Sequence, residues 1–158
     1  MNQFDLNDNF KKNVGDFILT FSEIEFNLCL LVSYLENGVD ANPLIPKIVG
    51  LSLDDKRKRI RNGLSERKSF LTIWSKIDGK LSDCNEFRRL IAHGIIMNHM
   101  PNPSLQALVK AKPRNGVEGF ILKEINNDEL LAKYKKLTEL YSGKNGIVEL
   151  IYNLKKTL

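Results

Sequence analysis

The sequence predicts a mainly α-helical bundle of about four to five helices with a small antiparallel β hairpin. Two long stripes of apolar residues at helical spacing, one near the start and one near the middle of the chain, predict the bundle. Alternating apolar runs on both sides of Asn115 and Gly116 predict the hairpin, because Asn-Gly favours a two-residue hairpin turn. With 158 residues, of which 42% are hydrophobic, the chain is expected to form a single domain over residues 1–158.

The first helix is expected to start at Asn7 or Asp8 and to end at Asn37, before Gly38. Asparagine and aspartate cap helix N-termini, and glycine commonly follows a helix C-terminus. The core-facing stripe recurs every three or four residues and comprises Phe10, Val14, Phe17, Phe21, Ile24, Leu28, Leu31 and Leu35.

A glutamate, Glu25, interrupts this stripe, four residues after Phe21 and three before Leu28. A carboxylate that faces the core needs a cationic partner, because burying an unpaired charge is very costly. One hypothesis therefore places Glu25 in contact with Arg88 or Arg89. In the alternative, Glu25 is half-exposed at the edge of the stripe.

The second helix is expected after a proline-containing connector over residues 39–50, which has room for one short helical turn. Ser52 or Asp54 can start this helix, which continues to about Leu64. Its inward residues are Leu53, Ile60 and Leu64.

The third helix is expected to begin near Ser65 and to carry the second apolar stripe. That stripe comprises Phe70, Leu71, Trp74, Ile77, Leu81, Cys84 and Phe87. Gly79 weakens the helix, so one long helix and two helices joined at residues 80–82 both fit the sequence.

The β part is expected to be an appendage over about residues 95–125, with two or three short strands between prolines. Asn127 or Asp128, followed by Glu129, can then start a last long helix. A break over residues 142–146 separates it from an apolar helical pattern over residues 147–154.

Composition points to a soluble cytoplasmic protein without a membrane span, metal or cofactor. No run approaches the ~20 uninterrupted apolar residues that cross a membrane. Cys29 and Cys84 lie in apparent helices without a CxxC or Cys/His cluster, so they are expected to be reduced core thiols. Phosphate-binding loops, dinucleotide fingerprints, zinc-protease motifs and G-x-S-x-G elbows do not occur in the sequence.

The chemistry-bearing stretch is residues 85–94, at the end of the third helix. Glu86, Arg89 and His93 follow one another at i, i+3 and i+7 on one polar helix face, and Arg88 lies one position round. Two guanidinium groups and an imidazole are thereby brought to one place, which suits the handling of a phosphate. In the alternative, His93 is a cation that complements the helix dipole, and Gly94 is the left-handed residue past the helix end.

The run from Arg88 to Gly94, Arg-Arg-Leu-Ile-Ala-His-Gly, resembles the Arg-x4–6-His motif of the HEPN superfamily. The resemblance assigns Arg88 and His93 as the motif pair, whereas Arg89 stands where that family more often has a short polar residue. It implies a small helical bundle, a homodimer with the motifs at its interface, and metal-independent endoribonuclease activity. It also implies a toxin, phage-defence or stress system, with an antitoxin or defence-system partner.

A metal-free ribonuclease needs a general base, a general acid and positive charge on the phosphorane. Imidazole serves as base or acid near neutral pH, and arginine binds phosphate oxygens. Two copies of Arg88 and His93 across a two-fold axis would supply both proton-transfer roles. His99 is a second candidate for the catalytic histidine. In the alternative, it is only a surface histidine.

The net charge of +5 is concentrated in one segment, residues 47–68, which holds eight basic and three acidic residues. Such a cluster is typical of a nucleic-acid interface. The expected RNA contacts are Lys56, Arg57, Lys58, Arg59 and Arg61. In the alternative, these residues only form the solvated face of a helix.

Two other functions fit the same residues. The first is a catalytically inactive HEPN-like module that acts as a dimeric interaction or nucleic-acid-binding component. The second is an unrelated helical bundle in which Glu25, Glu86, Arg88 and Arg89 form only a buried ion-pair network.

Overall fold

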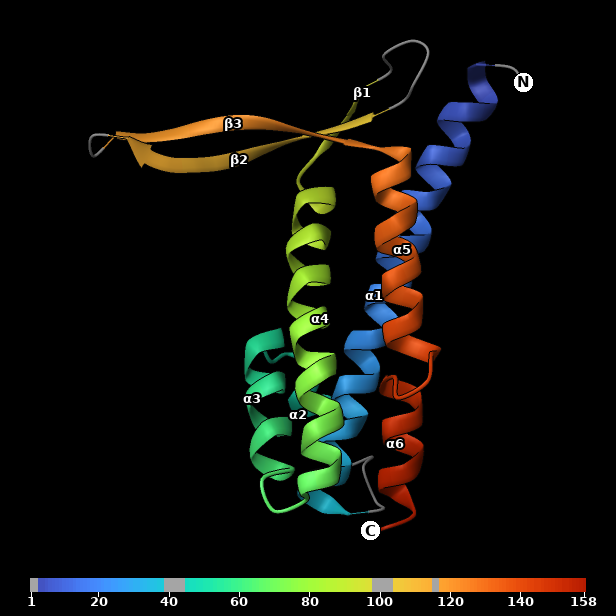
Figure 1. The fold of residues 1–158 in the computed structure, drawn as a ribbon, viewed down its shortest axis with the longest axis vertical. Coiled ribbons are helices and arrows are strands. Elements are labelled where there is room, and N and C mark those ends of the chain that lie inside the picture. Colours follow the sequence, from blue (N-terminus) through green and yellow to red (C-terminus); the bar gives the residue numbers. More distant parts are fainter. Residues whose placement is uncertain (1–2, 39–44, 98–103, 115–116) are drawn as a thin grey trace. The chain divides into compact units, whose positions relative to one another are not determined.

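A computed structural model describes residues 3–38, 45–97, 104–114 and 117–158 (Figure 1). The described residues form, in chain order, α1 (Gln3–Asn37), α2 (Ile45–Val49), α3 (Leu53–Gly63), α4 (Lys68–Ala92), β1 (Ile95–Met97), β2 (Ser104–Arg114), β3 (Val117–Asn126), α5 (Asn127–Ser142) and α6 (Ile147–Lys155). This order confirms the predicted mainly helical class with a small antiparallel sheet inserted after the motif helix.

The chain divides into two compact units. Unit 1 comprises Met1–Leu19 and Asp83–Lys136, and unit 2 comprises Thr20–Ser82 and Leu137–Leu158. Helices α1, α4 and α5 each contribute residues to both units. The expectation of a single domain over residues 1–158 therefore stays a prediction, and the two units are described separately.

Helix α1 ends as predicted and begins earlier than predicted. Gly38 follows it with φ 66°, and the Gly38 N–H donates to the carbonyl oxygen of Tyr34 at 2.9 Å. Its start at Gln3 shows that Asn7 and Asp8 were wrongly assigned as caps. Both lie inside the helix, because short polar residues mark a potential helix start without forbidding a helical backbone.

Most of the predicted α1 stripe is buried. Phe10, Phe17, Phe21, Ile24, Leu28 and Leu31 are at most 1% exposed, whereas Val14 and Leu35 are half-buried. Among the described residues, one stretch of α1, Asp8–Asn37, is long and apolar enough to cross a membrane by length and composition. Length and composition alone are weak evidence for a membrane span, because the core helix of a soluble protein meets the same criteria.

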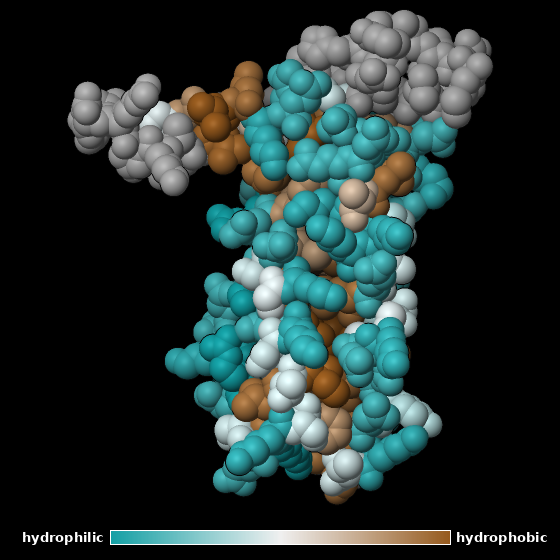
Figure 2. All heavy atoms as spheres, viewed as in Figure 1, coloured by the Kyte–Doolittle hydropathy of each residue, from teal (hydrophilic) through white to brown (hydrophobic). Residues whose placement is uncertain are grey.

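Unit 2 is built around the second half of α1 and the first half of α4. Of the two predicted starts for α3, Ser52 is the cap and Asp54 is not: the Ser52 Oγ accepts the N–H of Asp55 at 3.1 Å. Helix α4 continues through Gly79 without interruption, so the alternative with one long helix is confirmed. Figure 2 shows mainly polar side chains on the drawn outer faces of the helices. The core of this unit includes Ile60, Leu64, Trp74, Ile77, Leu81, Ile147, Leu150 and Leu154.

The sheet of unit 1 is three-stranded, with the order β1-β2-β3 and antiparallel pairing throughout. The β2–β3 register runs from Ser104 opposite Asn126 to Arg114 opposite Val117. The predicted Asn-Gly turn itself lies outside the described residues. The register is irregular between Ala111 and Arg114, a stretch that contains Pro113, which has no N–H to donate.

Helix α5 begins at Asn127, so the residue that caps it is Asn126 and not one of the two predicted caps. The Oδ1 of Asn126 accepts the Glu129 N–H at 2.9 Å and is the cap. Assigning Asn127 or Asp128 to this role was wrong, because both residues lie inside the first turn of α5; the Asn127 Oδ1 accepts from Nδ2 of Asn13 at 3.0 Å. The predicted break over residues 142–146 and the short helix that follows it are confirmed.

Candidate functional site

Packing in unit 1 fixes which face of α4 points outward at the motif. The Phe87 ring is 2% exposed and meets the Phe17 ring edge-on, with centroids 5.3 Å apart. The Lys133 Nζ lies 5.7 Å from the centroid of Phe87, and Ile91 is also buried. Phe87 and Ile91 thus anchor the helix in the core, and Leu90 beside them is half-buried.

The polar motif residues lie where helical spacing places them. Glu86, Arg89 and His93 are exposed, as expected for one outward face at i, i+3 and i+7. The backbone N–H of His93 donates to the Arg89 carbonyl oxygen at 3.2 Å, so the helical hydrogen bonding extends one residue past the end of α4. Arg89 and His93 therefore share a face one helical turn apart.

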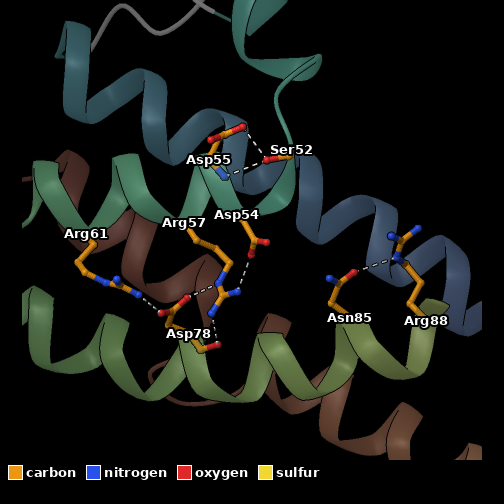
Figure 3. A network of polar contacts seen from close by, with 8 residues as sticks. All are labelled: Ser52, Asp54, Asp55, Arg57, Arg61, Asp78, Asn85 and Arg88. Carbon is orange, nitrogen blue, oxygen red and sulfur yellow. Dashed lines mark hydrogen bonds and ion pairs between the residues drawn. The ribbon is translucent and has the colours of Figure 1, made fainter. Parts of the chain in front are cut away.

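Arg88 is oriented differently from Arg89. It is half-buried, and its Nε donates to the Oδ1 of Asn85 at 3.2 Å (Figure 3). Asn85 lies one turn earlier on α4, so this bond holds the guanidinium along the helix. The side chain of Arg89 is the more exposed of the two arginines.

The alternative that made Gly94 the left-handed residue past the end of the helix is wrong. Among the described glycines, only Gly38 has a positive φ. A Cβ on Gly94 would instead lie 2.7 Å from Cγ of Leu105 and closer still to its Cδ2. Leu105 is a buried residue of β2, so the absence of a side chain at Gly94 lets the sheet pack against the motif end of α4.

Glu25 is half-buried on α1, and its carbonyl oxygen accepts the Cys29 thiol at 3.2 Å. It belongs to unit 2, whereas Arg88 and Arg89 belong to unit 1. The hypothesised contact between them therefore stays a prediction. His99, the second candidate histidine, lies outside the described residues.

The basic segment on α3 is largely paired inside unit 2. Lys56 is 4% exposed, and its Nζ donates to the Val49 carbonyl oxygen at 3.3 Å. Arg59 contacts the Glu36 carboxylate at 3.3 Å. Lys58 is exposed and has no ion pair within the described part of the chain. Of the five predicted RNA contacts, Lys58 therefore presents the most available charge.

The other two arginines of α3 converge on Asp78 of α4 (Figure 3). The Arg57 Nε lies 2.5 Å from Oδ1 of Asp78, and an Arg61 terminal nitrogen lies 2.7 Å from its Oδ2. Arg57 also contacts Asp54 at 2.9 Å. Burial raises the pKa of Asp78, but the hydrogen bonds and charges of Arg57 and Arg61 outweigh burial and hold that pKa below its usual value.

Asp78 was not predicted as a functional or structural residue from the sequence, although the sequence contains a signal for it. It lies four residues after Trp74 and three before Leu81, which is the same placement in an apolar stripe that singled out Glu25. Its side chain is 10% exposed. The argument that an inward carboxylate needs cationic partners would therefore have found this network.

The described residues hold no group of three or more His, Cys, Asp or Glu side chains that could bind a metal. Cys29 and Cys84 are free and buried. Burial raises the pKa of both thiols above their usual value, and nearby Lys56 opposes this rise at Cys29.

No family model matches the chain, and no curated protein or solved structure matches it either.

Proposed function

We propose that the protein is a metal-independent endoribonuclease that uses the motif at the end of α4. The observation that carries the proposal is the exposed His93 imidazole with the Arg89 guanidinium on the same helix face and Arg88 beside them. The resemblance of this stretch to the HEPN motif supports the same chemistry. RNA is the proposed substrate, because its 2'-hydroxyl supplies an internal nucleophile that needs only proton transfer and charge stabilisation.

In this proposal His93 transfers protons and the arginines hold the phosphate. An imidazole titrates near neutral pH and can take the 2'-hydroxyl proton or protonate the leaving 5'-oxygen. An arginine next to it stabilises the charge that develops on the phosphorane. The exposure of Arg89 suits it to meet a phosphate first, while Arg88 is half-buried and is bonded to Asn85 through its Nε.

One motif supplies one histidine, so the complete reaction favours two chains. A two-fold dimer that brings two copies of His93 together would provide an acid and a base for one scissile bond. We therefore propose a homodimer with the motif at its interface. A cytoplasmic toxin, phage-defence or stress system, with an antitoxin or defence-system partner, is the proposed setting.

A second candidate function is a HEPN-like module that binds RNA or a protein partner without cleaving RNA. The half-burial of Arg88 and its hydrogen bond to Asn85 favour it, because both restrict the access of a phosphate to the arginine that the motif assigns to it. The pairing of Arg57 and Arg61 with Asp78 limits how much free charge α3 offers to such a partner.

The test is cleavage of a mixed RNA substrate in EDTA by the wild type, His93→Ala and the control Asp83→Ala. Asp83 is an exposed residue of α4 outside the motif, so its loss should leave activity unchanged. Circular dichroism and analytical ultracentrifugation of the same samples establish folding and dimerisation. Activity in wild type and control that is lost in His93→Ala supports the nuclease, whereas RNA binding without cleavage by all three proteins supports the binding module.

A further inference from the structure

A pocket of about 190 Å³ lies in unit 2, where α4, the end of α5 and the loop before α6 meet. Buried Ile77 and Leu140 form its apolar floor. Its polar lining includes Lys76 and Lys80, one helical turn apart on α4, and Lys144 of the loop, together with the single carboxylate of Glu139. All of its lining residues belong to unit 2, whereas the motif residues belong to unit 1.

The three lysines of this pocket differ from the arginines of α3 in having no acidic partner. Lys76, Lys80 and Lys144 are exposed, and none forms an ion pair within the residues that the structure describes. Like charges at i and i+4, such as Lys76 and Lys80, destabilise a helix. With Glu139, the lining carries a formal charge of about +2 at neutral pH. An anion bound here would relieve the repulsion between the lysines.

The loop that carries Lys144 is held in one conformation by its own hydrogen bonds. The Gly143 N–H donates to the Glu139 carbonyl oxygen at 3.0 Å, and the Gly146 N–H donates to that of Gly143 at 2.8 Å. Asn145 adopts φ 58°, and its N–H donates to the Glu149 carboxylate. Lys144 is therefore presented by a preformed turn, which lowers the conformational entropy lost on binding.

We propose that this pocket binds a phosphate monoester. A monoester carries a charge of about −2 near neutral pH, which matches the lining, whereas a phosphodiester carries only about −1. The pocket is smaller than the ~300–1,000 Å³ typical of sites that enclose a whole small molecule. It therefore takes the phosphate group, and the remainder of the ligand lies in solvent. The proposal does not depend on ribonuclease activity.

The test is an NMR titration of the full-length protein with three probes: inorganic phosphate, adenosine 5'-monophosphate and the diester adenylyl-adenosine. Phosphate and the nucleotide should shift the backbone amide signals of Lys144, Asn145 and Gly146 in a saturable way. The diester should bind at least about fivefold more weakly, because its charge is about half that of the monoester. Saturation by phosphate alone would identify the free anion, and not a nucleotide, as the occupant.

The double variant Lys76→Gln/Lys144→Gln should weaken monoester binding by about tenfold or more, since two of the three cations are removed. Lys68→Gln is the matched control, because Lys68 is an exposed α4 lysine outside the pocket, and it should change binding less than about twofold. Three results would overturn the proposal: no saturable shift at the loop, equal affinity for monoester and diester, or equal loss of binding in the control and the double variant.

Discussion

Replacing Asp78 by asparagine should destabilise the protein more than any exposed ion-pair substitution. The Asp78 side chain is 10% exposed, and its two oxygens accept from Arg57 and Arg61. The Asp78→Asn change would keep the shape of the side chain, remove the charge and place an amide N–H against a guanidinium. Arg57, at 18% exposed, would then keep one carboxylate partner, Asp54, and its hydrogen bond to the backbone carbonyl oxygen of residue 78, whereas Arg61, at 59% exposed, can be hydrated.

The expected loss of unfolding free energy follows from these exposed fractions. A charge-assisted hydrogen bond to a mostly buried arginine contributes about 1.5–3 kcal/mol, and an exposed pair contributes about 0–1 kcal/mol. Asp78→Asn should therefore lower the free energy of unfolding by about 2–3 kcal/mol, slightly less than breaking a fully buried pair. For a chain of this size, that is a fall in Tm of about 4–12 °C.

Urea unfolding followed by circular dichroism at pH 7 measures this loss. Glu36→Gln is the control, because it breaks the exposed Glu36–Arg59 pair, in which both side chains are more than a third exposed, and should cost below about 1 kcal/mol. If Asp78→Asn is no more destabilising than Glu36→Gln, the assignment of Asp78 as the central partner of the α3 arginines is wrong.

The stability of Asp78→Asn should also depend on pH differently from that of the wild type. The pKa of Asp78 is lowered in the folded protein, so its contribution is fully present above the unfolded value of about 3.9 and is lost as pH falls through the lower folded value. Wild-type stability should therefore decrease below about pH 4 more steeply than that of Asp78→Asn. Parallel acid profiles for the two proteins would contradict this origin of the stability.

Three further substitutions test the remaining structural assignments through the free energy of unfolding. Gly94→Ala should cost about 1–3 kcal/mol, because the new methyl group would overpack against Leu105. A double-mutant cycle with Leu105→Ala should show coupling between the two positions, and purely additive effects would contradict the contact. Asn126→Ala should cost about 1 kcal/mol through loss of the α5 cap, and an unchanged midpoint would place the cap elsewhere. Ser33→Ala should be neutral or stabilising, because the buried Ser33 Oγ has no hydrogen-bond partner among the described residues; a loss above about 1 kcal/mol would reveal one.

Apolar periodicity was enough to predict the helices, whereas residue type alone did not determine where α1 and α5 begin. The burial of the stripe on α1 and the continuity of α4 follow from residues three and four apart. The α5 cap could not be chosen from residue type, because Asn126, Asn127 and Asp128 are all good caps. In the structure Asn127 is already helical and bonds to Asn13, a residue far from it in the sequence.

The sequence predicted which helix face carries the polar residues of the candidate site. It did not predict which side chains pair with the basic residues of α3. Helical spacing placed Glu86, Arg89 and His93 on one exposed face. The charge count on α3 did not reveal that its arginines are paired, because their main partner, Asp78, lies on another helix. The packing of the β2 residue Leu105 against Gly94 likewise depends on a tertiary contact that local sequence does not specify.

The proposed metal-free RNA cleavage by His93 is tested most directly by the chemistry of the cut ends. Wild type in EDTA should yield 5'-hydroxyl ends and 2',3'-cyclic phosphates, the products of attack by the 2'-hydroxyl. His93→Ala should yield neither above background, while the control Asp83→Ala should match wild type. Cut ends that carry 5'-phosphates, or cleavage that persists in folded His93→Ala, would contradict the mechanism.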